Sequence, residues 1–363
     1  MIRCSRFHSI PCLITISAAL ILPLLSGCEG VSYALQAAQG QFAIQGATEP
    51  IDDVLASGRL SEEDADKLRL LVKARDYASD VIGLNVGESY TEYYDSGDDP
   101  VVFNLMASPQ DSLEPITWWF PIFGVQETLM FFDEDYLDRE EQKLIDQGYD
   151  TYTYEVDAYS TGGFFKDPIR SPMLKRHTLS AVDTIFHELL HNTIWRSGES
   201  VFNESMATFV GRTLAAEFLV VEYGEDSGWG ELAGEYYSDI DAVNGFLLDI
   251  YDTLANYYAG PQDSTTKIAG REALYQTGRD QFTNEIRPAL NFPDAFSYYE
   301  DFPTNNAWMR LNYRYHLDLD VFESVYEATG QDWTATLDVF RAAAKAKEDP
   351  FEYLRQWLQE QES

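Results

Sequence analysis

The sequence predicts an α+β fold, with a small N-terminal lobe built on a mixed sheet and a mainly helical C-terminal lobe. Short apolar or alternating stretches, which are typical of strands, occur before residue 160. Beyond residue 179 the apolar residues recur at helical spacing. No internal repeat or low-complexity linker divides the chain, so we expect both lobes to belong to one domain with a cleft between them.

Three helices are predicted in the N-terminal half. Residues 29–48 and 60–82 carry apolar side chains along one helical face, and Ser61 is a typical N-cap for the second of them. Residues 133–147 form a charged helix that ends at Gly148, because glycine readily adopts the left-handed conformation found after helix ends.

Three strands are predicted between and after these helices. Residues 101–106 and 127–132 are short apolar runs of the kind that forms buried strands. Residues 151–158 alternate between apolar and polar side chains, which is typical of a strand with one buried face. We expect these strands to build the sheet of the N-terminal lobe.

The helix predicted over residues 179–195 carries the sequence HELLH at positions 187–191. His187 and His191 are offset on a helix by about 40° and about 6 Å, so both imidazoles can reach one ion. Glu188 lies about 100° around the helix from His187, where its carboxylate can act as the general base of a zinc metallopeptidase. The alternative is a pair of structural histidines on a core helix.

A catalytic zinc site needs a third protein ligand. Besides the two histidines of the pentad, His177 and His316 are available, whereas His8 lies in a segment that we expect to be removed. Glu204 opens a second predicted helix after a short turn at residues 197–199. Two helices joined by such a turn pack as neighbours, so Glu204 is the leading third ligand.

Three stretches of the sequence are similar to those of a known protein family. They are AYSTGGFFKDPIRSPML at 158–174, IFHELLHNTIW at 185–195 and FNESMATFV at 202–210. These stretches resemble the bacterial putative zinc aminopeptidase family, whose members are carried as lipoproteins. The likeness extends to residues 102–107, 119–121 and 305–307.

That family resembles the gluzincin metallopeptidases, whose ligands are the two histidines of HExxH and a downstream glutamate. The resemblance implies a gluzincin-like fold with the HExxH helix at the cleft. It also implies that His187, His191 and Glu204 bind one zinc ion per chain. Glu188 would then be the general base.

The chain departs from gluzincins at two points. Thermolysin-like gluzincins have an acidic residue four positions after the third ligand, where it orients a ligand histidine, and Thr208 stands there in this chain. Asp183, one turn before His187, could help to order the site instead. The GAMEN sequence that binds a substrate amine in the best-known gluzincin aminopeptidases is missing.

The resemblance also points to residues that would contact a substrate. In gluzincin-like folds a strand such as 151–158 edges the cleft and pairs with the extended substrate backbone. This would bring Glu155 or Asp157 near a substrate α-amino group, and Tyr159 would be a further cleft residue. The alternative is a half-exposed strand whose acidic face lies in water.

Gluzincins commonly use a tyrosine or histidine outside the ligand helix to stabilise the developing oxyanion. Tyr315 ranks first here, because it follows the family-like residues 305–307. His177, Tyr313 and His316 are the other candidates.

The N-terminus has the pattern of a bacterial lipoprotein signal peptide over residues 1–27. Two arginines precede an apolar stretch at 10–25, and Leu25-Ser26-Gly27-Cys28 matches a lipobox. A retained membrane anchor is the alternative, although the stretch is short for a spanning helix. We expect residues 28–363 to form the mature domain, held by lipid on Cys28 and facing the periplasm. Glu29 in place of aspartate favours the outer membrane.

Acidic residues dominate the composition, with 61 Asp and Glu against 25 Lys and Arg and a net charge of −36. Such a surface repels phosphate backbones, so nucleic acid is excluded as a partner. All three cysteines fall within the first 28 residues, so the mature chain has no cysteine for catalysis or for a zinc ribbon.

Together these features predict a lipid-anchored zinc peptidase, first of all an aminopeptidase, that acts on peptide or protein substrates. One alternative is an envelope assembly or quality-control lipoprotein that binds partners with little turnover. The other is a periplasmic endopeptidase.

Overall fold

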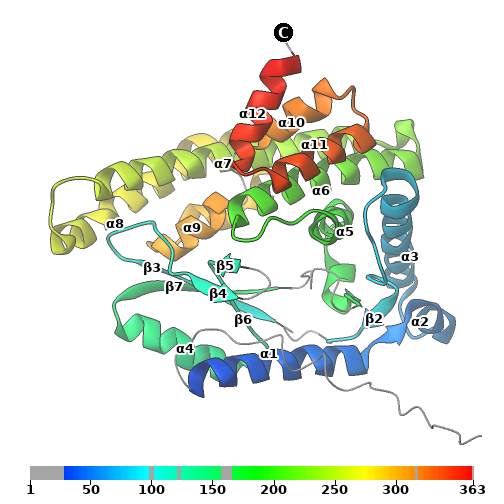
Figure 1. Cartoon of the computed structure of the whole chain (residues 1–363), viewed down its shortest axis with the longest axis horizontal. Coiled ribbons are helices and arrows are strands. Elements are labelled where there is room, and N and C mark those ends of the chain that lie inside the picture. Colours follow the sequence, from blue (N-terminus) through cyan, green and yellow to red (C-terminus); the bar gives the residue numbers. More distant parts are fainter. Residues whose placement is uncertain (1–27, 98–101, 121–123, 157–165, 315–317, 362–363) are drawn as a thin grey trace, which may run out of the picture.

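The computed structural model describes residues 28–97, 102–120, 124–156, 166–314 and 318–361 (Figure 1). The α-helices are α1 (Cys28–Ala47), α2 (Ile51–Ser57), α3 (Glu62–Tyr77), α4 (Glu134–Asp146), α5 (Thr178–Thr193), α6 (Ser200–Tyr223), α7 (Trp229–Tyr258), α8 (Ser264–Gln281), α9 (Asn306–Arg314), α10 (Leu319–Ala328), α11 (Trp333–Lys345) and α12 (Pro350–Gln361). The strands are β1 (Glu49–Pro50), β2 (Glu92–Tyr94), β3 (Phe103–Pro109), β4 (Trp118–Phe120), β5 (Gly124–Gln126), β6 (Leu129–Phe131), β7 (Tyr149–Glu155) and β8 (Ile169–Arg170). The protein is mostly helical with small sheets, which confirms the α+β class.

The described strands form three small sheets. β1, β2 and β8 form a mixed sheet, in which β2 runs antiparallel to β1 and parallel to β8. β3 lies between β6 and β7 in an antiparallel sheet, and β4 and β5 form a hairpin. The strands predicted over 101–106, 127–132 and 151–158 are therefore neighbours in one sheet, with β7 at its edge.

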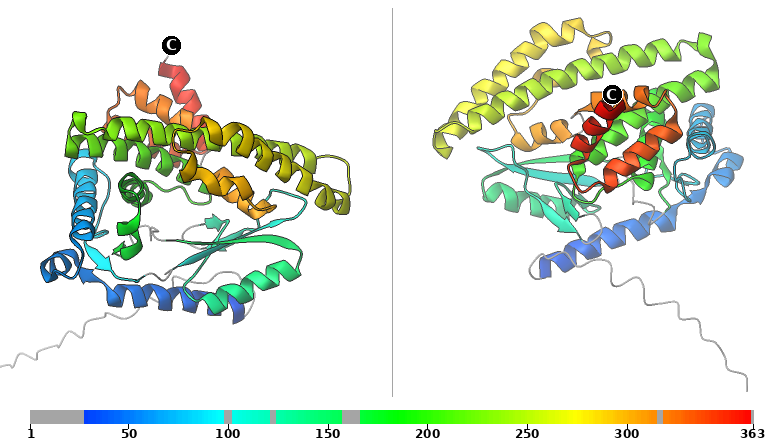
Figure 2. Two further views of the ribbon diagram at one scale, coloured as in Figure 1. Left: turned by 180° about the vertical axis from the view of Figure 1, so that it is seen from behind. Right: turned by 45° about the horizontal axis from the view of Figure 1, so that its top comes forward.

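Helices cover both faces of the β6–β3–β7 sheet. α9 packs on one face, and α1 and α4 pack on the other (Figures 1 and 2). Residues 105–108 of β3 are all buried, as expected for a central strand covered on both sides. A strand that is buried on both faces agrees with the apolar sequence at 101–106.

The predicted helix ends agree with the structure. Ser61 is the N-cap of α3, and its side chain accepts a hydrogen bond from the backbone N–H of Asp64. α3 continues into a π-helical turn, η1 (Ala78–Ile82). α4 has Asp133 as its N-cap, and Gly148 follows it with a φ of 84°. The helices predicted over 60–82 and 133–147 are thus present, and they span residues 62–82 and 134–146.

Asn306 joins the sheet to the helical layer through a buried polar network. Its amide group donates to the carbonyls of Pro109 and Ser112 and accepts from the hydroxyls of Tyr258 and Tyr275. Its backbone N–H donates to the buried carboxylate of Asp150 in β7. That carboxylate also makes a two-pronged ion pair with Arg271 of α8. The family-like residues 305–307 therefore have a structural role here.

A membrane-spanning helix would need a long apolar stretch. Among the described residues, none of the helices combines the length and the apolar character needed to cross a bilayer. The predicted signal segment over residues 1–27 lies outside the described residues.

Candidate metal centre

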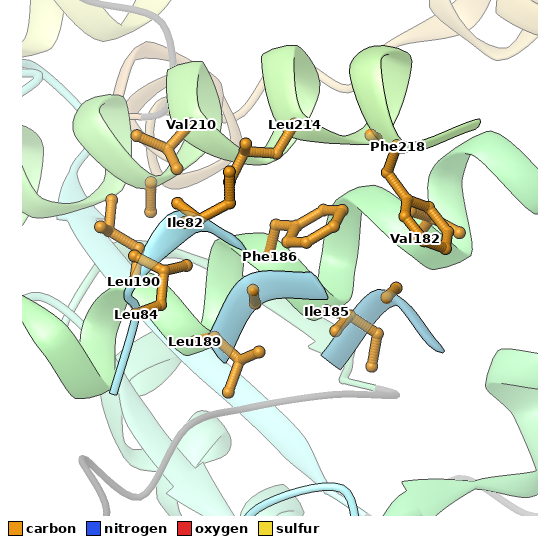
Figure 3. Close-up of a cluster of buried hydrophobic side chains, with 14 of the residues drawn as sticks. Ile82, Leu84, Val182, Ile185, Phe186, Leu189, Leu190, Val210, Leu214 and Phe218 are labelled. Carbon is orange, nitrogen blue, oxygen red and sulfur yellow. The ribbon is translucent and has the colours of Figure 1, made fainter. Parts of the chain in front are cut away.

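The HExxH sequence lies on α5, which is anchored by its apolar face. Figure 3 shows side chains of α5 in one apolar cluster with side chains of α6 and with Ile82 and Leu84. Those of α5 are Val182, Ile185, Phe186, Leu189 and Leu190, and those of α6 are Val210, Leu214 and Phe218. This packing fixes the rotation of α5 about its own axis. The polar face, which carries His187, Glu188 and His191, is turned away from this core.

The structure brings His187, His191 and Glu204 together. The Nε2 atoms of the two histidines are 3.2 Å apart. Glu204 Oε2 lies 3.4 Å from Nε2 of His187 and 3.8 Å from Nε2 of His191. Each residue can point one donor atom at a common centre, and all three are mostly buried.

These spacings fit a zinc ion. Ligand atoms about 2.0–2.1 Å from a tetrahedral zinc lie about 3.3 Å from one another. The three measured separations lie close to that edge length, and two imidazoles with one carboxylate are a donor set that catalytic zinc sites use. Three protein donors leave the fourth tetrahedral position open for water or substrate.

Glu204 comes from α6, which begins at Ser200. The helix starts four residues before Glu204, so Glu204 is at the beginning of the second turn rather than in the first. The turn between α5 and α6 contains Gly198 in the left-handed region, with a φ of 83°. It folds α6 back along α5, which is why a residue outside the pentad reaches both histidines.

Carboxylates surround His187. Burial by itself lowers the pKa of His187, but the hydrogen bond with Glu204 and the charges of Glu188 and Asp183 outweigh it. The pKa of His187 is therefore raised in the metal-free protein. A metal ion has to compete with this proton, because only the neutral imidazole can bind it.

Asp183 lies one turn before His187 and is enclosed by α5, α6 and α7. Burial raises its pKa to about 6, against the opposing charges of Arg212 and His187. The hydroxyl of Tyr237 donates a hydrogen bond of 3.4 Å to its carboxylate. Space for this carboxylate exists because residue 211 is glycine: a Cβ there would lie 2.3 Å from Asp183 Oδ1 and 3.2 Å from His187 Cβ.

Glu188 is partly buried, and its charge acts on Tyr90 in the loop after α3. In that loop Tyr90 is buried and has a left-handed φ of 62°. Burial raises the pKa of Tyr90 well above its usual value, and the charge of Glu188 raises it further. Tyr90 is thus a neighbour of the pentad that the sequence did not indicate, because 98 positions separate it from Glu188.

The other predicted residues are not part of the three-donor cluster. His177 precedes α5, and its ring lies 6.1 Å from that of Trp229. Tyr313 stacks on Tyr251 at 4.0 Å. Glu155, at the end of β7, is exposed and makes no hydrogen bond or ion pair with the described residues around the pentad.

Four candidates lie outside the described residues. They are Asp157, Tyr159, Tyr315 and His316. Cys28 is the first residue of α1.

Residues 32–352 match the family described as "Putative aminopeptidase". The chain belongs to this family. The match spans α1 to α12 and includes the pentad, Glu204 and Asp183, and it supports a peptidase role for the chain. No curated protein and no solved structure matches the chain.

Proposed function

We propose that this member of the family is a zinc-dependent peptidase, with one zinc ion held by His187, His191 and Glu204. The observation that carries the proposal is the spacing of their three donor atoms, 3.2, 3.4 and 3.8 Å, on two helices packed side by side. Two structural histidines on a core helix would have no need of a carboxylate at this distance from both rings.

When bound, zinc polarises a substrate carbonyl and lowers the pKa of coordinated water. Glu188 is the general base: it takes the proton from the attacking water and delivers it to the leaving amine. Glu188 is next to His187 on α5 and is not one of the three clustered donors. Tyr315 is the first candidate for stabilising the oxyanion, and His316 is an alternative.

Asp183 acts as a positioning residue for His187 in this proposal. Replacing it with asparagine is expected to weaken zinc binding by about 10- to 100-fold, because supporting carboxylates hold the orientation and basicity of a ligand histidine. Asparagine has nearly the same shape and no charge, and burial already disfavours the charge of Asp183, so the fold should persist. Competition with a fluorescent zinc chelator measures the affinity.

The control for this variant is Asp320→Asn, which changes an exposed aspartate on α10. Wild-type affinity is expected for the control. Equal affinities for Asp183→Asn and wild type would show that Asp183 does not support the site. Tyr237→Phe removes the hydrogen bond to Asp183 and should shift zinc affinity in the same direction by a smaller factor.

Within the peptidase class we propose aminopeptidase action. An aminopeptidase binds the free α-amino group of its substrate, and the candidates for this contact are Glu155, Asp157 and Tyr159. N-acetylation removes the ammonium charge, so the zinc-loaded protein should cleave unblocked peptides and leave their N-acetylated forms intact. Mass spectrometry of paired peptides that differ only in the acetyl group measures this.

Two other outcomes would assign a different function. Equal cleavage of free and acetylated peptides would indicate an endopeptidase. No cleavage of any peptide by the zinc-loaded protein would favour an envelope assembly or quality-control factor.

We also propose that the mature protein carries lipid on Cys28 and faces the periplasm, at the outer rather than the inner membrane. The support is the lipobox at residues 25–28, after which the sequence has no cysteine.

A further inference from the structure

The outer face of α1 carries large apolar side chains that are exposed. Leu35 is 55% exposed and Phe42 is 60% exposed. They are seven residues apart, so they lie on the same face of the helix, about 10 Å from each other along its axis. Ser32, Gln39, Ala43 and Gly46 share this exposed side.

The opposite face of α1 fixes this orientation. Tyr33 and Ile44 are buried, and the side-chain amide of Gln36 bonds to the backbone of Met130 and Phe132 next to β6. Gly40 lies so close to the ring of Phe132 that a Cβ there would be 2.1 Å from its Cγ. The helix therefore cannot rotate to bury Leu35 and Phe42.

The exposed face also lacks charge. Charged residues make up 24% of the chain, yet residues 30–48 contain none. A surface helix in water normally carries charged residues on its outer side. In a chain with a net charge of −36, this stretch is where an apolar, uncharged partner can approach without desolvating a carboxylate.

We propose that the outer face of α1 lies in the interfacial region of a lipid bilayer, with Leu35 and Phe42 inserted among the lipid chains. α1 forms an outer edge of the molecule, on the far side of the sheet from the C-terminal helices α10–α12 (Figures 1 and 2). The helix begins at Cys28, so lipid on that residue, as proposed above, would bring this face to the membrane. The contact favours zwitterionic lipid, because the acidic protein is repelled by anionic headgroups.

The cysteine content of the chain allows a direct test. Cys4 and Cys12 leave with the signal segment and Cys28 is blocked by lipid, so the mature lipoprotein should have no free thiol. An environment-sensitive fluorophore can then be placed at Phe42→Cys alone. Val221→Cys is the matched control, because Val221 is 66% exposed on α6, away from α1. Both full-length variants are produced in a host that processes lipoproteins and are reconstituted with phosphatidylcholine vesicles.

In vesicles that contain doxyl-labelled phosphatidylcholine, the probe at position 42 should shift to the blue and be quenched several-fold more than the probe at position 221. Adding Leu35→Glu to the Phe42→Cys variant should reduce that quenching, because a carboxylate at this depth lifts the helix from the lipid.

Equal quenching at both positions, or protein that does not float with the vesicles, would overturn the proposal. A probe at position 42 that is already shielded from water without vesicles would overturn it too, since a second copy of the chain would then cover α1.

Discussion

Replacing Glu204 with alanine is expected to reduce zinc affinity by more than about 100-fold, beyond the effect typical of a supporting residue. The variant removes one of three donors and leaves His187 and His191, whose two nitrogens cannot enclose the ion. Its carboxylate lies 3.4 Å from Nε2 of His187 and 3.8 Å from Nε2 of His191, so the substitution removes the oxygen donor from the cluster. Zinc content after dialysis against a mild chelator measures the effect, and calorimetric competition gives the affinity.

Glu199→Ala provides the matched control. Glu199 lies directly before α6 and pairs with Arg196 at 3.9 Å, so it tests the same region without touching the donor cluster. This variant should retain zinc as wild type does. If Glu204→Ala also retained zinc, the third ligand would have to be another residue, and the proposed site would be wrong.

Replacing Glu188 with glutamine should leave zinc bound and lower peptide turnover by about 10²- to 10⁴-fold, the usual effect of losing a general base. Glutamine has nearly the same size as glutamate and keeps one oxygen that accepts hydrogen bonds. Its amide group, however, cannot take up a proton at neutral pH. The decrease should fall on kcat rather than on KM, because the proton is transferred in the transition state.

The informative comparison pairs turnover with metal content. Zinc-loaded Glu188→Gln with wild-type turnover would exclude Glu188 as the base. Conversely, a deletion strain fully rescued by Glu188→Gln, with a wild-type protein that cleaves no peptide, would support the assembly-factor alternative.

Much of the fold could be predicted because its signals are local. The N-cap at Ser61, the alternation along 151–158 and the helical period after residue 179 each depend on residues close in sequence. How the strands are shared among three sheets was not predictable. The parallel pairing of β2 with β8, for example, joins residues 93 and 169, which are 76 positions apart in the sequence.

The role of residues 305–307 could not be predicted from the sequence. In sequence they stand in a stretch that suggested a catalytic tyrosine nearby. In the structure Asn306 is fully buried and holds β3, β7, α7 and α8 together through its hydrogen bonds. A polar residue can be required by a buried network or by catalysis, and one sequence does not distinguish the two.

The sequence by itself determined the relation between His187 and His191, because helix geometry sets the offset of residues four apart. It also determined that a third ligand close to the pentad has to be a histidine or a carboxylate, since no cysteine follows Cys28. Only the tertiary structure decided which carboxylate approaches. Glu204 reaches both rings because α6 folds back along α5, and the close contact at Gly211 lets Asp183 fit beside His187. Those distances depend on side-chain packing between two helices, which no local pattern encodes.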